Sequence, residues 1–296
     1  MKLALYSRPS NVEGSDFITE VILFLLEKNA NVAVFHTLFP LLPESVQRRL
    51  SGTFTNQQEL SALCPDFLFS IGGDGTFIDA ANLVGNSGLP ILGINTGRIG
   101  FLTNVNRSNF REAFDFLQKS DYQIEKRSLL QVRSDNGAEL PATFALNDIS
   151  IHPHGDSINA VHVEANGERL NTYWGDGLIV ATPTGSTAYS LSCGGPILVP
   201  SANVMVLTPI ASHSLTVRPI VLPTDNELKI KVESRSHRFI LSVDSHRLTM
   251  DDDVTLTVCR APYTIQTIRL PNAGFYSVIR EKLLWGLDKR NFSNNE

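Results

Sequence analysis

The feature that most constrains the fold is a change in hydrophobic patterning near residue 121. Before it, short apolar runs alternate with longer segments that contain few helix breakers. We expect strands at residues 2–6, 31–35, 66–71 and 90–94, helices at residues 16–28, 77–84 and 107–119, and a loop with some helix at residues 40–52. Because strands that alternate with helices form βαβ units, this part predicts an α/β domain with a parallel sheet.

After residue 121 the chain consists of short, often β-branched runs separated by turn signals such as Asn166-Gly167. We expect strands at residues 124–132, 142–152, 159–165, 177–182, 204–209, 227–232 and 238–243, and a helix at residues 275–287. The predicted parts are an α/β domain over residues 1–122, a mainly β domain over residues 123–270 and a helical segment over residues 271–296.

Composition limits the class of protein. Hydrophobic residues make up 42% of the 296 residues and charged residues 19%, as in a globular protein with a sizeable core. The formal net charge of -5 argues against a surface that binds nucleic acid or an anionic membrane. Three cysteines, none in a CxxC pair, favour a reducing compartment. The start is too polar for a signal peptide, and the longest apolar run, residues 21–26, is far shorter than the roughly 18 residues of a membrane span. We therefore expect a cytoplasmic protein.

The strongest local signal is Gly72-Gly73-Asp74-Gly75-Thr76, between an expected buried strand and an expected helix. Three glycines let the backbone come close to a ligand, and a helix N-terminus offers free N–H groups and a positive dipole end to phosphate. Because the charge of Asp74 opposes phosphate binding, we expect this carboxylate to bind a ribose hydroxyl, hold a divalent metal or act as a general base. The alternative is a tight strand-to-helix turn in which Asp74 is the helix N-cap.

A second signal is the segment 182–190, which carries five serine or threonine hydroxyls together with a proline and a glycine. Such a segment can present hydroxyls and backbone groups to a flat polar ligand, and Tyr189 adds a face for stacking. The alternative is a surface loop rich in serine and threonine.

Two shorter signals accompany it. Asn147-Asp148 follows an apolar run, and the asparagine can bind an adenine edge while the aspartate accepts from a ribose hydroxyl; the alternative is a turn. Gly175-Asp176-Gly177 is open to a functional role or to a plain hairpin turn. The histidines at 152, 154 and 162 lack companions at metal-ligand spacing, so we expect a solvated strand face there.

These motifs carry a family resemblance. Gly72 to Thr76 resembles the GGDGT motif that NAD kinases share with diacylglycerol-kinase and phosphofructokinase groups, and the segment 182–189 resembles the more specific second NAD-kinase motif. Further matches lie at residues 97–103, 147–148, 175–180 and 213–220, in the family order. The chain therefore resembles NAD kinases over essentially its whole length.

The resemblance implies an architecture and an activity. The expected fold is an N-terminal α/β domain with a parallel sheet, a C-terminal β-sandwich-like domain and a C-terminal segment that returns to the first domain, with the active site between the domains. The expected reaction is phosphoryl transfer from ATP to the 2′-hydroxyl of the NAD adenosine ribose, giving NADP, with a divalent cation, Mg²⁺ being expected. A homo-oligomer, dimer or tetramer, is also expected.

The resemblance assigns roles to single residues. Asp74 is expected to activate the attacking 2′-hydroxyl, and the ATP phosphates are expected at Gly72, Gly73, Gly75 and Thr76. No protein ligand to a metal is assigned. The expected NAD contacts are Asp74, Gly75, Asn147, Asp148, Asp176, Thr187, Ala188, Tyr189, Ser190, Leu191, Ser192 and His246.

Two departures and two rival functions accompany the resemblance. The family commonly has Asn-Glu where this chain has Asn147-Asp148, which shortens the carboxylate by one methylene. A late Asp-Gly-Gln motif reads Asp244-Ser245-His246 here, so His246 is expected to take the glutamine's role. The rivals are a lipid kinase that shares the glycine loop, which predicts membrane attraction, and a non-catalytic NAD(H)-binding sensor, which predicts binding without ATP turnover.

Overall fold

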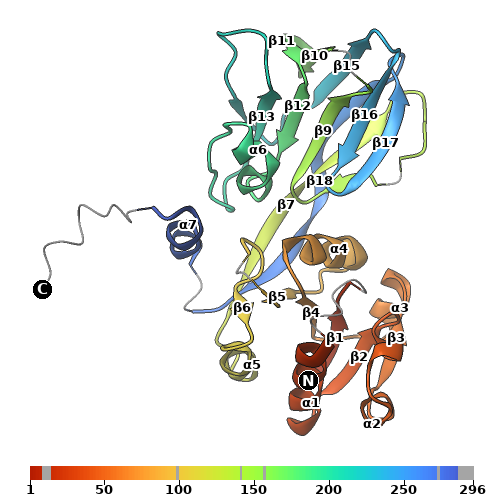
Figure 1. Cartoon of the computed structure of the whole chain (residues 1–296), viewed down its shortest axis with the longest axis vertical. Coiled ribbons are helices and arrows are strands. Elements are labelled where there is room, and N and C mark those ends of the chain that lie inside the picture. Colours follow the sequence, from red (N-terminus) through yellow and green to blue (C-terminus); the bar gives the residue numbers. More distant parts are fainter. Residues whose placement is uncertain (9–14, 98–99, 141, 156–157, 272–273, 286–296) are drawn as a thin grey trace, which may run out of the picture. The chain divides into compact units, whose positions relative to one another are not determined.

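The computed structural model describes residues 1–8, 15–97, 100–140, 142–155, 158–271 and 274–285, and the chain divides into two compact units (Figure 1). The first unit contains Met1–Glu125 and the chain from Ile265 onward, and the second contains Lys126–Thr264. The chain passes between the units twice, within strands β7 (Gln123–Ser134) and β18 (Thr255–Arg269). The first unit is therefore built from both ends of the sequence.

The first unit is organised around a parallel sheet with the strand order β3-β2-β1-β4-β5. The strands are β1 (Lys2–Tyr6), β2 (Asn31–Phe35), β3 (Gly52–Phe54), β4 (Phe67–Ile71) and β5 (Ile91–Asn95). Beyond β5, the two-residue strand β6 (Val105–Asn106) pairs with its end and β18 pairs with its start. The parallel sheet expected from the strand–helix alternation is confirmed.

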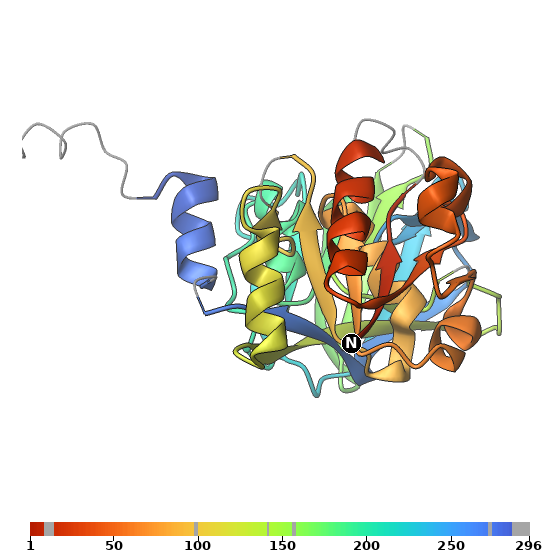
Figure 2. The same cartoon turned by 90° about the horizontal axis from the view of Figure 1, so that it is seen from below.

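Helices cover both faces of this sheet. Helices α1 (Ser15–Glu27) and α5 (Phe110–Gln118) lie side by side on one face (Figure 2). The rings of Phe17 and Phe24 on α1 meet the ring of Phe110 on α5 edge to face. Helix α4 (Asp74–Val84) lies on the opposite face (Figure 1). The shorter helices are η2 (Phe39–Leu41), α2 (Glu44–Gln47), α3 (Gln57–Ala62), η3 (Gly85–Ser87) and α7 (Phe275–Leu283).

The second unit consists of two antiparallel sheets that enclose one apolar core, to which both contribute, as Val161 and Ile230 from one sheet and Ile151 and Leu241 from the other illustrate. One sheet has the order β14-β13-β12-β9-β16-β17 and the other the order β11-β10-β15-β18. The strands are β8 (Phe144–Ala145), β9 (Asp148–Pro153), β10 (Asn159–Ala165), β11 (Glu168–Gly175), β12 (Gly177–Ala181), β13 (Val204–Ile210), β14 (Ile220–Pro223), β15 (Leu228–Ser234), β16 (Arg238–Val243) and β17 (His246–Asp251). The mainly β second part expected from the sequence is confirmed.

Several expected elements differ in their bounds. The run 142–152 is not one strand, because the backbone N–H groups of Leu146 and Asn147 bond to the side chain of Asp244 and separate β8, which pairs with β7, from β9, which belongs to the other sheet. The expected helix at 275–287 ends at Leu283 as α7, and residues 286–287 lie outside the described residues.

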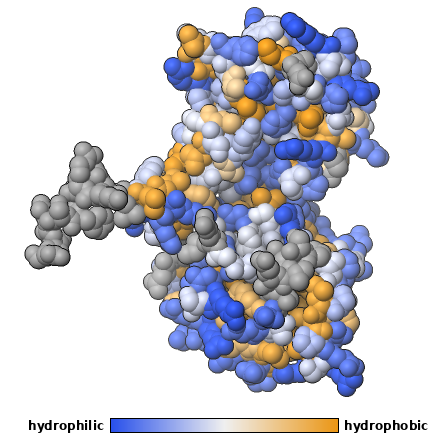
Figure 3. Space-filling model, viewed as in Figure 1, coloured by the Kyte–Doolittle hydropathy of each residue, from blue (hydrophilic) through white to orange (hydrophobic). Residues whose placement is uncertain are grey.

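The surface mixes polar and apolar side chains. On the face drawn in Figure 3, small hydrophobic patches interrupt a mostly hydrophilic surface. Cys64, Cys193 and Cys259 form no disulfide. None of the helices within the described ranges has the length and apolar character needed to cross a membrane.

Candidate active site

The glycine loop connects β4 to α4 in the first unit. Gly72 follows β4 with a φ of 152°, a backbone conformation that favours glycine, and its N–H bonds to the carbonyl of Ile94 at 2.8 Å. Gly73 is the N-cap of α4, and the helix begins at Asp74. The alternative in which Asp74 caps the helix is therefore wrong, because the Asp74 side chain bonds to another loop.

The carboxylate of Asp74 is fixed by three hydrogen-bond donors from residues 101–103. Its Oδ2 accepts from the N–H of Phe101 at 2.8 Å. Its Oδ1 accepts from the N–H of Leu102 and from the hydroxyl of Thr103, both at 3.1 Å. Since a carboxylate offers about four acceptor positions, the described residues occupy three of them and leave one for a ligand.

The segment that holds Asp74 belongs to the motif at residues 97–103, of which Arg98 and Ile99 lie outside the described residues. The hydroxyl of Thr103 accepts from the Nδ2 of Asn95 at 2.9 Å while it donates to Asp74, so its orientation is determined from both sides. A Cβ at Gly100 would lie 1.7 Å from Oδ1 of Asp74, which explains why this position is a glycine.

The space next to Gly73 in the glycine loop is open. A Cβ built on Gly73 would meet no atom of the described residues within 4 Å, whereas one built on Gly75 would lie 3.1 Å from the Nη1 of Arg8. Thr76 is buried in the first turn of α4. The backbone N–H groups in the first turn of a helix have no partner within the helix, so this end of α4 can bind an anion.

In the second unit, Asp244 positions the Asn147-Asp148 pair. Its carboxylate accepts three backbone hydrogen bonds, from Leu146 at 2.8 Å, Asn147 at 2.9 Å and Asp148 at 3.0 Å. Asp244 itself has a positive φ of 49°, which aspartate tolerates better than most residues. The half-buried amide side chain of Asn147 makes no hydrogen bond within the described part of the chain, which leaves it available to a ligand.

The two carboxylates differ in their electrostatic surroundings. Burial and the neighbouring charge of Asp244 raise the pKa of Asp148 to about 7, against a weaker opposing hydrogen bond from Ser150. Burial also raises the pKa of Asp244, while its three backbone N–H donors oppose that rise. Because those donors favour a negative charge, Asp244 is the better placed of the two to carry it, while the raised pKa of Asp148 makes its protonated form accessible near neutral pH.

The hydroxyl-rich segment 182–190 is built into the unit and is not a surface loop. The hydroxyl of Thr182 donates to the carbonyl of Leu146 at 2.6 Å and accepts from the N–H of Gly185 at 3.0 Å. The buried hydroxyl of Ser186 donates to Pro183 and accepts from Leu198. The surface-loop alternative is therefore wrong, and these hydroxyls fix the segment in place.

The NAD contacts expected at residues 187–192 differ in their burial. Ser190 is fully buried and bonds to the hydroxyl of Thr208 at 2.8 Å, so it holds the segment against β13. Thr187, Ala188 and Leu191 are half-buried, and Tyr189 and Ser192 are exposed. The last two are the members best able to contact a ligand.

Gly175-Asp176-Gly177 is not a hairpin turn, because β11 and β12 belong to different sheets. A Cβ at Gly177 would lie 1.9 Å from the carbonyl oxygen of Ile151, so the crossing between sheets requires glycine there. Asp176 is exposed between the two glycines. Burial raises the pKa of Tyr189, and the charges of Cys193, Asp148 and Asp176 add to this rise, which places Asp176 near Tyr189.

His152 was missed by sequence reasoning. It stacks on Tyr189 with a ring separation of 5.9 Å, and its Nε2 lies 2.9 Å from the hydroxyl of Ser150. Burial, with a smaller contribution from Arg247, lowers the pKa of His152. The expected solvated strand face is therefore wrong for His152. The alternation of Asp148, Ser150 and His152 on β9 is the signal that could have placed it on the same face as Asp148.

His246 lies where β17 begins, exposed beside the turn that contains Asp244. Within the described residues, no group of three or more His, Cys, Asp or Glu side chains is placed to hold a metal ion. A resident metal site therefore does not fit the described side chains, whereas a cation that enters with phosphate oxygens needs few protein ligands.

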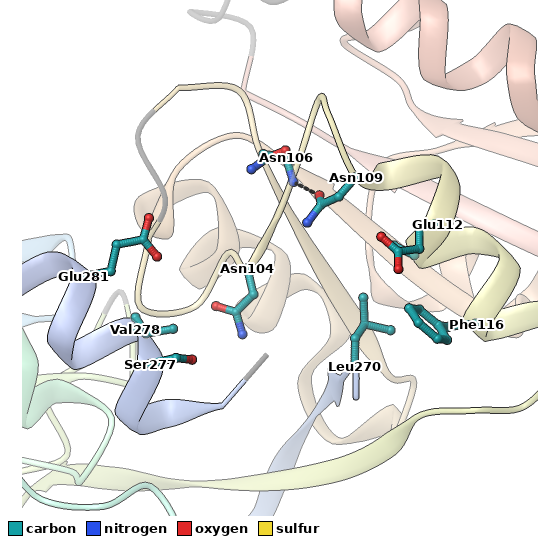
Figure 4. A pocket seen from close by; sticks show the side chains of 10 residues that line it. Asn104, Asn106, Asn109, Glu112, Phe116, Leu270, Ser277, Val278 and Glu281 are labelled. Atoms are coloured by element: carbon teal, nitrogen blue, oxygen red, sulfur yellow. Dashed lines mark hydrogen bonds between the residues drawn. The ribbon is translucent and has the colours of Figure 1, made fainter. Parts of the chain in front are cut away.

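The first unit also contains a pocket of about 200 Å³ between α5 and α7 (Figure 4). Its lining residues are Asn104, Asn106, Asn109, Glu112, Ala113, Phe116, Leu270, Ser277, Val278 and Glu281. None of the site residues expected from the sequence is among them, so the pocket is separate from the glycine loop.

Comparison with known proteins agrees with the division of the chain into two units. The family model of the ATP-NAD kinase N-terminal domain matches residues 9–122, and that of the ATP-NAD kinase C-terminal domain matches residues 146–270. Together they contain the glycine loop, the Asn147-Asp148 pair and the hydroxyl-rich segment.

Relatives and solved structures extend the likeness to the whole chain. A NAD kinase of Flavobacterium psychrophilum is 40% identical over 98% of this chain and 100% of its own length. The crystal structure of yeast NADH kinase complexed with NADH is 24% identical, with a TM-score of 0.86 over 100% of this chain and 90% of that chain. The structure of a NAD kinase from Archaeoglobus fulgidus in complex with ATP, also 24% identical, has a TM-score of 0.73 over 96% and 99% of the two chains. The matched domain models and the full-length relative show that this chain belongs to the NAD kinase family.

Proposed function

We propose that the protein transfers the γ-phosphoryl group of ATP to the 2′-hydroxyl of the adenosine ribose of NAD, giving NADP. The observation that carries the proposal is the carboxylate of Asp74, which Phe101, Leu102 and Thr103 hold at the start of α4 and which has one acceptor position that no described residue occupies. A carboxylate fixed in this way can accept and orient a hydroxyl proton without reorganising.

The glycine loop is proposed to bind the ATP phosphates. The open space above Gly73 supports this assignment, as do the free N–H groups expected in the first turn of α4. Gly72 and Gly75 keep side chains away from the loop, and the buried Thr76 packs the first turn. The substrate is proposed to be MgATP, whose cation is held mainly by phosphate oxygens and neutralises part of their charge.

The second unit is proposed to bind the dinucleotide. The amide of Asn147 can make two hydrogen bonds with an adenine edge, and Asp148 can bond to ribose hydroxyls in either protonation state. Tyr189 offers an exposed ring face for stacking. Asp176, Ser192 and His246 are proposed as further NAD contacts because all three are exposed in this unit.

The chemistry demands little covalent work from the protein. In an in-line transfer, the 2′-hydroxyl oxygen bonds to the γ-phosphorus as the bond from that phosphorus to the bridging oxygen of ADP breaks. Asp74 accepts or orients the proton that leaves the hydroxyl. Most of the rate enhancement is then expected from positioning and from charge neutralisation.

The test is a coupled assay for NADP⁺ formation from NAD⁺, ATP and Mg²⁺, run with the wild type and with Asp74→Asn. We expect activity in the wild type and a loss of roughly 10²–10⁴-fold in kcat in the variant, as for removal of a general base. A folded wild type that binds NAD and forms no NADP⁺ with ATP or polyphosphate would instead support a dinucleotide sensor. Parallel reactions with NADH in place of NAD⁺ measure the preferred acceptor.

The homo-oligomer and the cytoplasmic location remain predictions. Light scattering coupled to size-exclusion chromatography measures the first, and fractionation of cells that express the tagged protein measures the second. A monomer at working concentration would contradict the expected assembly.

A further inference from the structure

Arg8 lies beside the glycine loop, at the point where the strand order of the first unit's sheet reverses. The chain runs from β1 to β2 on one side, while β4 pairs with the other side of β1, so the strand order reverses between β1 and β4. In open parallel sheets, ligands bind outside the carboxyl ends of the strands at such a reversal. Arg8 follows β1 and Gly72 follows β4, so both stand at this edge.

The side chain of Arg8 is held in place by α4. Its Nε lies 2.5 Å from Oδ2 of Asp79, which also accepts from the hydroxyl of Tyr6 at 3.4 Å. The hydrogen bond to Asp79 raises the pKa of Arg8, and burial raises the pKa of Tyr6 to about 12. The guanidinium is therefore a fixed cation, and with 38% of its side chain exposed it remains within reach of a ligand.

The end of the guanidinium away from Asp79 faces the glycine loop. A Cβ on Gly75 would lie 3.1 Å from Nη1 and 3.6 Å from Nη2. Gly75 is the second residue of α4, so its N–H belongs to the first turn. The terminal nitrogens of Arg8 are therefore beside the first turn of α4, and a guanidinium at such a place can add charge-assisted hydrogen bonds to a phosphate bound there.

Negative charges near the glycine loop make a cation favourable there. The first six residues of α4 include the two carboxylates Asp74 and Asp79, whose charges oppose a polyphosphate. Arg8 neutralises Asp79 through Nε, and within the described residues its terminal nitrogens form no ion pair, so they can bind a second anion. We propose that Arg8 binds the phosphates of the nucleotide donor at the glycine loop, an inference that rests on the proposed function.

The experiment measures KM for ATP and KM for NAD separately in Arg8→Ala and Arg8→Lys, together with calorimetric binding of inorganic tripolyphosphate. We expect Arg8→Ala to raise KM for ATP by roughly tenfold or more, because a charge-assisted hydrogen bond is lost. The Kd for tripolyphosphate should rise by a similar factor. Arg8→Lys should recover part of this loss. Arg48→Ala, which removes an exposed arginine paired with Glu44 on α2, is the matched control and should leave both constants unchanged.

Asp79→Asn and the double variant Arg8→Ala/Asp79→Asn distinguish phosphate binding by Arg8 from a purely structural role of the Arg8–Asp79 ion pair. If Arg8 acts on phosphate, Asp79→Asn has a small effect and the double variant behaves like Arg8→Ala. Equal losses in Asp79→Asn and Arg8→Ala, or unchanged KM for ATP in Arg8→Ala, would overturn the proposal. A rise in KM for NAD alone would overturn the donor assignment and place Arg8 on the NAD pyrophosphate. If the wild type forms no NADP⁺ but binds tripolyphosphate, and Arg8→Ala weakens that binding, the proposed function is wrong while the phosphate site at Arg8 is supported.

Discussion

Gly100 lies so close to Asp74 that a Cβ at position 100 would stand 1.7 Å from the carboxylate oxygen Oδ1. The same Cβ would lie 2.3 Å from the hydroxyl of Thr103, which bonds to that oxygen. The position of the Asp74 carboxylate therefore requires a glycine at position 100 in the neighbouring loop.

Gly100→Ala should therefore displace the carboxylate and lower kcat. We expect a loss of roughly a hundredfold, since a displacement of about 1 Å in a catalytic group has effects of that size. The matched control is Gly97→Ala, whose Cβ would have Asn95 Oδ1 as its nearest neighbour at 3.9 Å, an ordinary contact. Similar kcat values for the two variants would contradict the close packing of Gly100 on Asp74.

Thr103→Val separates the anchoring of Asp74 from its chemistry. The substitution removes one of three described donors to the carboxylate, together with the hydrogen bond from the Nδ2 of Asn95 to Thr103. We expect a fall in kcat of about tenfold or less, far smaller than that of Asp74→Asn, because two backbone donors remain. Thr103→Ser keeps the hydroxyl and should stay close to the wild type. If Thr103→Val and Asp74→Asn lose the same activity, Asp74 acts mainly as a loop anchor.

Gly73→Ala tests the open space above the glycine loop. Its φ of −86° suits alanine, so we expect folding stability to change by no more than about 1 kcal/mol, the usual size of an N-cap effect. KM for ATP should rise because the methyl group occupies the space that the phosphates need. Gly274→Ala, at the N-cap of α7 with a φ of −94°, is the matched control and should leave KM for ATP unchanged. Unchanged ATP affinity in Gly73→Ala would place the phosphates elsewhere.

The raised pKa of Asp148 predicts a pH-dependent stability. Between about pH 4 and pH 7 the unfolded chain has released this proton while the folded chain keeps it, so the contribution of Asp148 falls as pH rises through this window. Asp148→Asn removes the titration and should gain stability relative to the wild type as pH rises, by at most about 4 kcal/mol. Urea unfolding of both proteins at pH 5, 6, 7 and 8 measures the difference. A difference that stays constant would mean that folded Asp148 is ionised throughout.

Periodicity was enough to predict the two kinds of architecture, because parallel strands alternate with helices and antiparallel strands alternate with turns. It could not predict contacts between distant residues. Arg8 reaches Asp79, and Asp244 reaches residues 146–148, through pairings that no local pattern encodes. The inward orientation of the hydroxyls at Thr182 and Ser186 was also hidden, since composition alone does not distinguish a hydroxyl that fixes the backbone from one that faces a ligand.

The hydrogen bonds of Asp244 also bear on the order of folding. They span 96 to 98 positions in the chain, so Asn147 and Asp148 reach their final geometry only after the turn between β16 and β17 has docked beside β9. Contacts of such long range form late and slow the folding of β domains. A nascent chain that has not yet synthesised β16 lacks these hydrogen bonds, so the proposed adenosine contacts at Asn147 and Asp148 are expected to form among the last features of the fold.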